Sequence, residues 1–175
     1  MTIVVRAYTS SDLAAVHTIN EAEAPAVGSV TPERMAHIAA ESAIALVAVD
    51  AAAGADAVAG FALVLGPGAD YDSDNYAWFA ARYPDFVYLD RVAVAPTHRR
   101  RGVGRALYDA VAAAAPSARP AATDWVLEVN LRPRNDTSLA FHAAMGFREV
   151  GQHESRAGYL VSMMSRTLAI ELGTA

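Results

Sequence analysis

One turn near the middle of the chain constrains the fold more than any other segment. The hydrophobic run 86–94 ends at Ala95-Pro96, a cluster of arginines follows, and Gly102 and Gly104 open an apolar helical pattern. Strand–turn–helix units of this kind belong to α/β folds, and their glycines let backbone N–H groups approach an anion at a helix start. The segment therefore predicts an anion-binding turn within an α/β domain.

The arginines of this turn favour the same interpretation. Arg99, Arg100 and Arg101 precede the predicted helix, and Arg105 lies in its first turn. Cations at a helix N-terminus cost roughly 0.3–1 kcal/mol each, and a phosphate bound there would offset this cost. The alternative is a solvated basic turn. A dinucleotide-binding fingerprint fits poorly, because Leu107 stands where its third glycine is needed.

The rest of the pattern predicts an α/β fold in one domain, residues 1–175, with a mixed central sheet of about seven strands flanked by about four helices. Residues 51–56 read as a hairpin turn, and residues 66–84 as an irregular loop. We expect strands over residues 3–8, 43–50, 57–65, 86–94, 125–131, 147–152 and 159–166, and helices over about residues 13–20, 32–40, 102–115 and 137–145.

Composition limits the possible partners and chemistry. The net charge of −5 argues against nucleic-acid binding. The N-terminal segment lacks the pattern of a secretory signal, and no run reaches the roughly 18 apolar residues of a membrane span, so we expect a cytoplasmic protein without a membrane partner. Cysteine is absent and all fourteen basic residues are arginine. This excludes cysteine nucleophiles and lysine Schiff bases. The histidine spacing predicts no metal site.

These motifs resemble the GNAT superfamily of N-acetyltransferases. The family signature is Gln or Arg, two residues, Gly, one residue, then Gly or Ala, and it grips the pyrophosphate of coenzyme A. Arg99, Gly102 and Gly104 match it. The resemblance is close over about residues 86–152 and extends to the earlier residues only in element order. It implies a GNAT fold and transfer of an acetyl group from acetyl-CoA to an amine.

The resemblance also implies the contacts with acetyl-CoA. Segment 89–96 resembles a bulged family strand, on which the Val92 N–H would polarise the thioester carbonyl and Val94 would pair with the pantetheine. One such donor is typically worth ~10²–10³ in rate. Asn135 has a second interpretation as a helix cap. The implied coenzyme contacts are Val92, Ala93, Val94, Arg99, Arg100, Arg101, Gly102, Val103, Gly104, Arg105, Asn135, Ser138 and Phe141.

Acetyl transfer needs a neutral amine, and Glu128 is the first candidate base. An ε-amine of pKa ~10.4 costs roughly 4–5 kcal/mol to neutralise at pH 7, whereas an α-amine near 8 costs ~1.4 kcal/mol. Glu128 lies mid-strand among apolar residues, where a charge is costly unless paired or functional. Alternation puts Glu128 and Asn130 on one face, toward a cleft if the other face fills the core. The alternative is a buried ion pair with Arg91.

Asp90 and His142 are the other catalytic candidates. Asp90 is expected two residues before the strand bulge, on the same face as Val92, as a second base or a partner of Arg91. His142 occupies the position where many family members have a tyrosine general acid. An imidazole titrates near pH 6.5 and could protonate the leaving thiolate. Alternatively, His142 packs against the coenzyme without proton chemistry.

The acceptor is predicted to be a small-molecule or peptide amine. The aromatic and acidic loop at residues 66–84 suits a cationic amine, although its aromatics could instead cover the core. The substrate-binding candidates are Tyr71, Asp72, Tyr76, Trp78 and Glu128.

The sequence thus predicts an acetyl-CoA-dependent N-acetyltransferase that works by direct attack in a ternary complex. Because the chain has no cysteine, transfer through an acyl-cysteine intermediate is excluded. One alternative is a CoA-binding sensor or partner-binding module without transferase activity, and another is a nucleotide-binding regulatory domain. The apolar final strand and the tail 168–172 would support a homodimer. The identity of the acceptor and the length of the acyl chain stay open.

Overall fold

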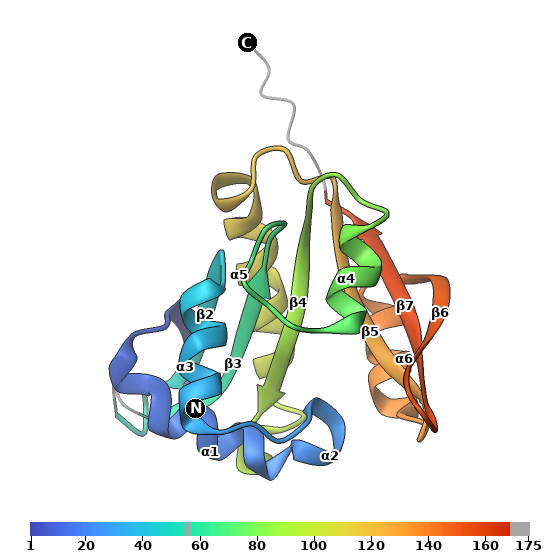
Figure 1. The fold of residues 1–175 in the computed structure, drawn as a ribbon. Helices are drawn as coiled ribbons and strands as arrows, with labels where there is room; N and C mark the ends of the chain where they lie inside the picture. Colours follow the sequence, from blue (N-terminus) through green and yellow to red (C-terminus); the bar gives the residue numbers. More distant parts are fainter. Residues whose placement is uncertain (55–56, 169–175) are drawn as a thin grey trace.

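The computed structural model describes residues 1–54 and 57–168, and a seven-stranded sheet runs through its centre (Figure 1). The strand order is β1-β2-β3-β4-β5-β7-β6. Within these residues, neighbouring strands are antiparallel except for β4 and β5, which are parallel. The predicted α/β fold with a mixed seven-stranded sheet is confirmed. The strands are β1 Ile3–Ala7, β2 Ile44–Asp50, β3 Val58–Leu65, β4 Phe86–Val94, β5 Asp124–Arg132, β6 Arg148–Arg156 and β7 Tyr159–Thr167.

Helices cover both faces of the sheet, with α1, α3 and α4 in front and α5 and α6 behind in Figure 1. Val103, Leu107 and Val111 of α5 are buried in the same core cluster, as their helical spacing predicts. In residues 1–54 and 57–168, no helix has the length and apolar character needed to cross a membrane. The helices are α1 Leu13–Ala22, α2 Ala24–Val27, α3 Pro32–Glu41, α4 Asp74–Ala80, α5 Val103–Ala118 and α6 Asp136–Ala144.

Helix α4 corrects the loop predicted over residues 66–84. Ser73 caps this helix, because its hydroxyl accepts the Tyr76 N–H at 3.3 Å, and Asp74 lies in the first turn. Tyr76 and Phe79 then pack into a core cluster on the front face of the sheet. The Asp and Gly content of the segment favours a loop locally, but burial of its aromatic residues stabilises a helix. The short helix α2 was not predicted either.

The last strand lies inside the sheet and not at its edge. β7 pairs with β5 on one side and with β6 on the other, and its residues Val161 and Met163 are buried. β6 also extends further than the predicted strand over residues 147–152, because it pairs with β7 along most of its length. The apolar final strand therefore gives no support for a homodimer. Residues 169–172 of the predicted dimer tail lie outside the described residues.

The two parallel strands β4 and β5 separate after a short region of pairing. In the described part of the chain, their pairing is confined to residues 86–88 of β4 and 124–126 of β5. The register of β4 against β3 then shifts at Asp90, which has no partner in that register. A bulge of this kind bends its strand. The carboxyl-terminal parts of β4 and β5 consequently lie on opposite sides of an opening.

Candidate active site

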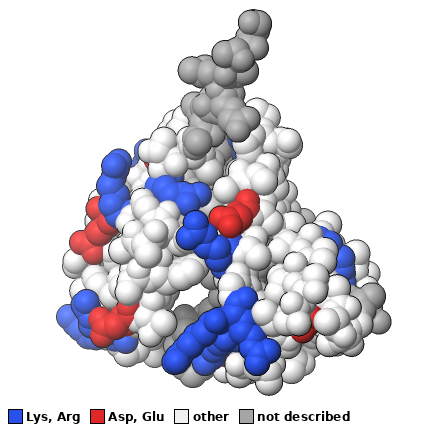
Figure 2. Space-filling model, turned by 180° about the vertical axis from the view of Figure 1, so that it is seen from behind, with Lys and Arg blue, Asp and Glu red and all other residues white. Residues whose placement is uncertain are grey.

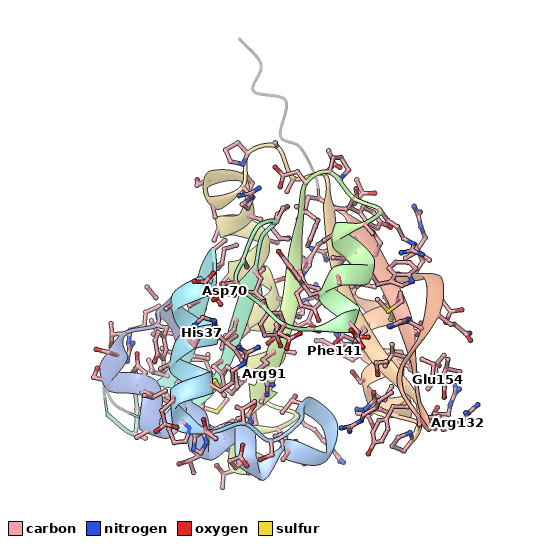
Figure 3. The ribbon with its side chains drawn as sticks, in the orientation of Figure 1. His37, Asp70, Arg91, Arg132, Phe141 and Glu154 are labelled. Carbon is pink, nitrogen blue, oxygen red and sulfur yellow. The ribbon has the colours of Figure 1, made fainter. Side chains whose placement is uncertain are left out.

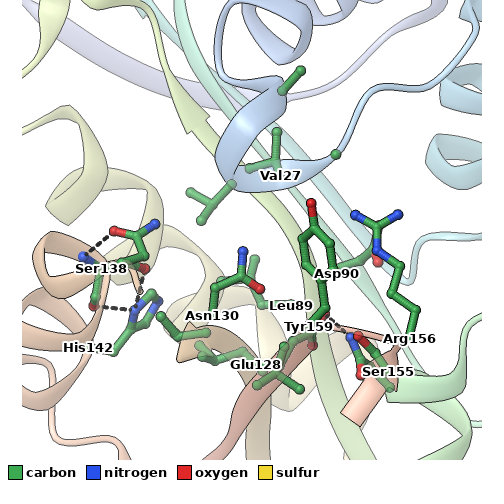
Figure 4. Close-up of a pocket in the computed structure, with 18 of the residues that line it drawn as sticks. Val27, Leu89, Asp90, Glu128, Asn130, Ser138, His142, Ser155, Arg156 and Tyr159 are labelled. Carbon is green, nitrogen blue, oxygen red and sulfur yellow. Dashed lines mark hydrogen bonds between the residues drawn. The ribbon is translucent and has the colours of Figure 1, made fainter. Parts of the chain in front are cut away.

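A cleft of about 570 Å³ lies between the separated ends of β4 and β5 (Figure 4). The two strands form its floor, α6 forms one end, and the adjoining ends of β6 and β7 form the other. Ala24, Val27, Gly28 and Ser29 in and after α2, together with Asn75 of α4, also line the cleft. The other lining residues are Leu89, Asp90, Val92, Leu127, Glu128, Val129, Asn130, Asn135, Ser138, His142, Ser155, Arg156, Tyr159 and Val161.

Glu128 lies on the floor of this cleft with one carboxylate oxygen bonded and one free. Its Oε1 accepts hydrogen bonds from Asn75 Nδ2 at 3.0 Å and from the Tyr88 hydroxyl at 3.1 Å. Its Oε2 is buried and has no hydrogen-bond partner among the described residues. Burial, and then the charge of nearby Asp90, raise the pKa of Glu128 to about 7. Such a carboxyl group suits proton transfer at neutral pH.

The raised pKa of Glu128 predicts that Glu128→Gln stabilises the protein at high pH. The fold disfavours the ionised carboxylate, so the wild type loses stability as pH rises from about 4.5, the ordinary pKa, to about 7. Glutamine does not titrate. With roughly 2–4 °C per kcal/mol for a domain of this size, we expect the variant's Tm to exceed that of wild type by at least ~3 °C at pH 8. At pH 4.5 the two should coincide.

Thermal melts between pH 4.5 and pH 8 measure this difference. Glu154→Gln is the control, because Glu154 is exposed on β6 and outside the cleft lining. A Tm difference that is the same at every pH would show that the carboxylate of Glu128 is not disfavoured by the fold.

Arg91 does not pair with Glu128, so that alternative for Glu128 is wrong. The side chain of Arg91 extends toward the α1–α2 segment (Figure 3). Its Nη1 donates to Asn20 Oδ1 at 2.9 Å, to the Val27 carbonyl at 3.0 Å and to the Gly28 carbonyl at 2.8 Å. Arg91 is buried. It therefore anchors the segment that covers one side of the cleft.

Asp90 lies at the bulge itself and not two residues before it. Val92 packs toward α5, whereas the Asp90 carboxylate lies on the other face, where it accepts the Tyr71 hydroxyl at 2.6 Å. Its Oδ2 lies 3.3 Å from Arg91 Nε. The side chain is only 5% exposed, and burial raises the pKa of Asp90 although Arg91 opposes this effect. The extra residue at a bulge changes which residues share a face, which corrects the prediction.

His142 lies at the α6 end of the cleft with both ring nitrogens engaged. Nδ1 is 2.7 Å from the Ser138 carbonyl oxygen, and Nε2 is 2.5 Å from the Tyr108 hydroxyl. A carbonyl oxygen only accepts, so Nδ1 carries the proton and Nε2 accepts from Tyr108. Burial lowers the pKa of His142, which favours the neutral ring. The ring is thus fixed in position by α5 and by its own helix.

The turn between β4 and α5 has the backbone geometry of an anion site. Arg100 has φ 58° and Gly102 has φ 82°, and both values are left-handed. Turns of this kind direct successive N–H groups to one side. None of the described side chains caps α5, so the amides of its first turn are left for a ligand.

Exposed arginines surround this turn. Figure 2 shows basic side chains at the lower edge of the face that α5 covers, beside a hollow in the surface. Arg99 forms an ion pair with Glu23, and Arg105 lies 3.7 Å from Asp109. Exposed pairs contribute little in water. These arginines could therefore exchange their partners for phosphate groups.

Three of the predicted coenzyme contacts meet at Gly104. A Cβ atom added there would lie 3.7 Å from Phe141 Cζ and 4.0 Å from Val94 Cγ2. β4, α5 and α6 thus converge between the anion turn and the cleft. Asn135 is the cap of α6, because its Oδ1 accepts the Ser138 N–H at 3.0 Å, and both residues also line the cleft. Ala93 and Val103 have buried side chains, which leaves only their backbone for a ligand.

Of the five predicted substrate-binding residues, Glu128 lines the cleft, whereas Tyr71, Asp72, Tyr76 and Trp78 lie outside the lining. Tyr76 is 6% exposed, and its hydroxyl donates to the Gly66 carbonyl at 2.8 Å, so it is a core residue. Trp78 stacks under the guanidinium of Arg82, with 3.8 Å between Arg82 Cζ and the ring centre. The alternative reading, that the aromatic residues of this segment cover the core, is correct for Tyr76.

Tyr71 and Asp72 do not lie in the substrate cleft, where they were predicted. Asp72 is exposed, and Tyr71 reaches the site only through its hydrogen bond to Asp90. Asn75 is the residue of this segment that lines the cleft. It points there because α4 is a helix, which the loop prediction could not reveal.

The adjoining ends of β6 and β7 form a part of the cleft that the sequence does not predict. Ser155, Arg156 and Tyr159 line its outer end. Their only local pattern is a tight turn between two strands, which carries no chemical signal. Among residues 1–54 and 57–168, no group of three or more acidic or histidine side chains is arranged to hold a metal ion.

The site combines a glycine turn, an uncapped helix start and two separated parallel strands. Comparison with known families assigns this combination. Residues 13–147 match the model of the acetyltransferase (GNAT) family. The chain belongs to this family. It is a GNAT N-acetyltransferase that uses acetyl-CoA. The family assignment made from the motifs is confirmed.

Solved structures of other proteins share this fold over nearly the whole chain. The ribosomal-protein-S18-alanine N-acetyltransferase from Escherichia coli is 17% identical, with a TM-score of 0.69 and 99% of each chain covered. Ard1 from Thermoplasma volcanium is 21% identical, with a TM-score of 0.72, covering 97% of this chain and 100% of its own. Arabidopsis thaliana NAA60 in complex with acetyl-CoA is 18% identical, with a TM-score of 0.75 and coverage of 95% and 99%. The comparison with curated proteins gives no match.

Proposed function

We propose that this GNAT enzyme transfers the acetyl group of acetyl-CoA directly to an amine bound in the cleft, with Glu128 as the general base. The observation that carries the proposal is the free, buried Oε2 of Glu128 on the cleft floor. Because its pKa is raised to about 7, the carboxylate can take a proton from an ammonium ion at neutral pH. The chain has no cysteine, which favours direct attack over a covalent route.

The proton balance of this reaction is simple. The bound ammonium first loses a proton to Glu128, and the neutral amine attacks the thioester carbonyl carbon. The C–N bond forms, the C–S bond breaks, and the nitrogen loses a second proton as the amide appears. One of the two protons ends on the coenzyme A thiolate and the other leaves to solvent.

The donor is proposed to lie along the line from the β4–α5 turn to the cleft. Its pyrophosphate would meet the backbone N–H groups of residues 99–104 and the nearby Arg105. Its pantetheine would pass Val94 and Phe141 beside Gly104, which has no side chain to fill this space. The N–H of Val92, which lines the cleft on the β4 side, is the proposed donor to the thioester carbonyl oxygen.

The contacts of His142 favour its packing role over proton donation. Both ring nitrogens already have partners, and the pKa of the ring is lowered by burial. The proposed role of His142 is to shape the α6 end of the cleft against the coenzyme. Tyr108 then acts as a positioning residue for His142.

We predict that Tyr108→Phe lowers the free energy of unfolding by about 1–2 kcal/mol, because Nε2 of the buried His142 loses its donor. Urea denaturation measures this loss. Tyr83→Phe is the control, since the Tyr83 hydroxyl makes no hydrogen bond to the described residues. The kcat of Tyr108→Phe should stay within about threefold of wild type. A fall of tenfold or more at unchanged stability would assign the Tyr108–His142 pair to proton transfer.

Release of free CoA across an amine panel tests the proposed function. The panel contains amino acids, polyamines, aminoglycosides and peptides with free N-termini, and each is tested with acetyl-CoA and propionyl-CoA. We expect release that depends on one class of acceptor. Binding of acetyl-CoA with no acceptor-dependent release from any class would instead favour the CoA-binding module.

A further inference from the structure

The outer end of the cleft holds an arginine that the proposed reaction does not use. Arg156 is the last residue of β6 and lies across the cleft from His142, with Glu128 between them (Figure 4). Its side chain is exposed and forms no ion pair with another described residue. Its Cζ lies 3.7 Å from the centre of the Tyr159 ring.

This arrangement is suited to a carboxylate. An arginine stacked on an aromatic ring keeps its N–H edge available and held in one plane, and that edge matches the two oxygens of a carboxylate. Among the described residues that line the cleft, Arg156 is the one arginine. The outer end of the cleft therefore attracts an anionic group.

The floor of the same cleft has the opposite requirement. Glu128 Oε2 and Asn75 Oδ1 are both buried and have no hydrogen-bond partner among the described residues. Buried acceptors normally have donors, and a bound amine or ammonium supplies N–H groups for both. Asp90 Oδ2 also lacks a hydrogen-bond partner among the described residues, but it differs because the charged Arg91 Nε lies 3.3 Å away. The cleft thus provides a cation site at its floor and an anion site at its outer end.

We propose that the acceptor is an amino acid or a similar small zwitterion. Its amine would meet Glu128 and Asn75, and its carboxylate would meet Arg156. The proposal rests on the proposed function, because it concerns the acceptor of the same cleft. Polyamines and aminoglycosides lack the carboxylate and would bring positive charge against Arg156, so the site selects against them.

Calorimetric titration tests this proposal without turnover. The protein is saturated with CoA, the reaction product, and titrated with the L-amino acids, β-alanine, 4-aminobutyrate and 5-aminopentanoate, each paired with its carboxamide. We expect at least one acid to bind ten times or more tightly than its carboxamide. In Arg156→Gln, affinity for the acid should fall at least tenfold while affinity for the carboxamide stays unchanged. Arg156→Lys should restore part of the preference for the acid, because lysine keeps the positive charge but lacks the two parallel N–H donors of the guanidinium.

Arg148→Gln is the matched control, because Arg148 is exposed on the same strand β6 but lies outside the cleft lining. It should keep the full preference for the acid. The proposal is overturned if no acid binds, if acids and carboxamides bind equally, or if Arg156→Gln keeps the preference. Acids that bind but are never acetylated would count against the proposed transfer and not against this acceptor site.

Discussion

Replacement of Glu128 by glutamine should lower kcat by about 10²-fold or more, the range expected for loss of a positioned base. Glutamine keeps an oxygen for the hydrogen bonds from Asn75 and Tyr88 but cannot take a proton. The anion turn at the start of α5 is untouched, so affinity for acetyl-CoA should stay within about twofold of wild type. Steady-state kinetics and calorimetry with acetyl-CoA measure the two effects separately.

The pH profile distinguishes a base from a structural carboxylate. A base must be ionised, so wild-type kcat/KM should rise with pH through about 7, the raised pKa of Glu128. In Glu128→Gln this rise of kcat/KM through pH 7 should disappear, while the pH dependence that comes from ionisation of the amine remains. Exposed Glu154→Gln should keep the wild-type profile. Unchanged turnover in Glu128→Gln would reduce Glu128 to a structural role.

Gly104→Glu should abolish acetyl-CoA binding, with Kd raised ~100-fold or more. The new side chain would fill the space beside Phe141 and Val94 and bring a negative charge to the start of α5, where a phosphate is expected. Wild type should show a clear rise in Tm with millimolar acetyl-CoA, since a ligand at 100 times its Kd adds ≈ 2.7 kcal/mol. In Gly104→Glu the rise should be absent.

Two further variants separate a lost site from a lost fold. Ala113→Glu adds the same charge at an exposed position further along α5 and should keep the full Tm rise. In Gly104→Ala the new Cβ meets its neighbours at ordinary contact distances, so the protein without ligand should fold normally. A full Tm rise in folded Gly104→Glu would show that the β4–α5 turn is not part of the acetyl-CoA site.

The parts of the site that could be predicted from the sequence are those built by neighbours in the chain. The turn from Arg99 to Gly104 is local, because a glycine in a left-handed conformation and an uncapped helix start need no distant partner. The face of Glu128 also follows from strand alternation, with Trp125 and Leu127 in the core behind it. These patterns were enough to predict the α/β fold, the family and the candidate base.

Tertiary structure alone decided how the acceptor half of the cleft is built. The bulge at Asp90 separates β4 from β5 and reverses the face that alternation predicts. Burial of aromatic residues turns a predicted loop into α4, which brings Asn75 to Glu128. Arg156 reaches the cleft only through pairing of β6 with β7. Side-chain periodicity is a property of each segment, whereas a bulge and the order of strands depend on contacts between segments far apart in the sequence.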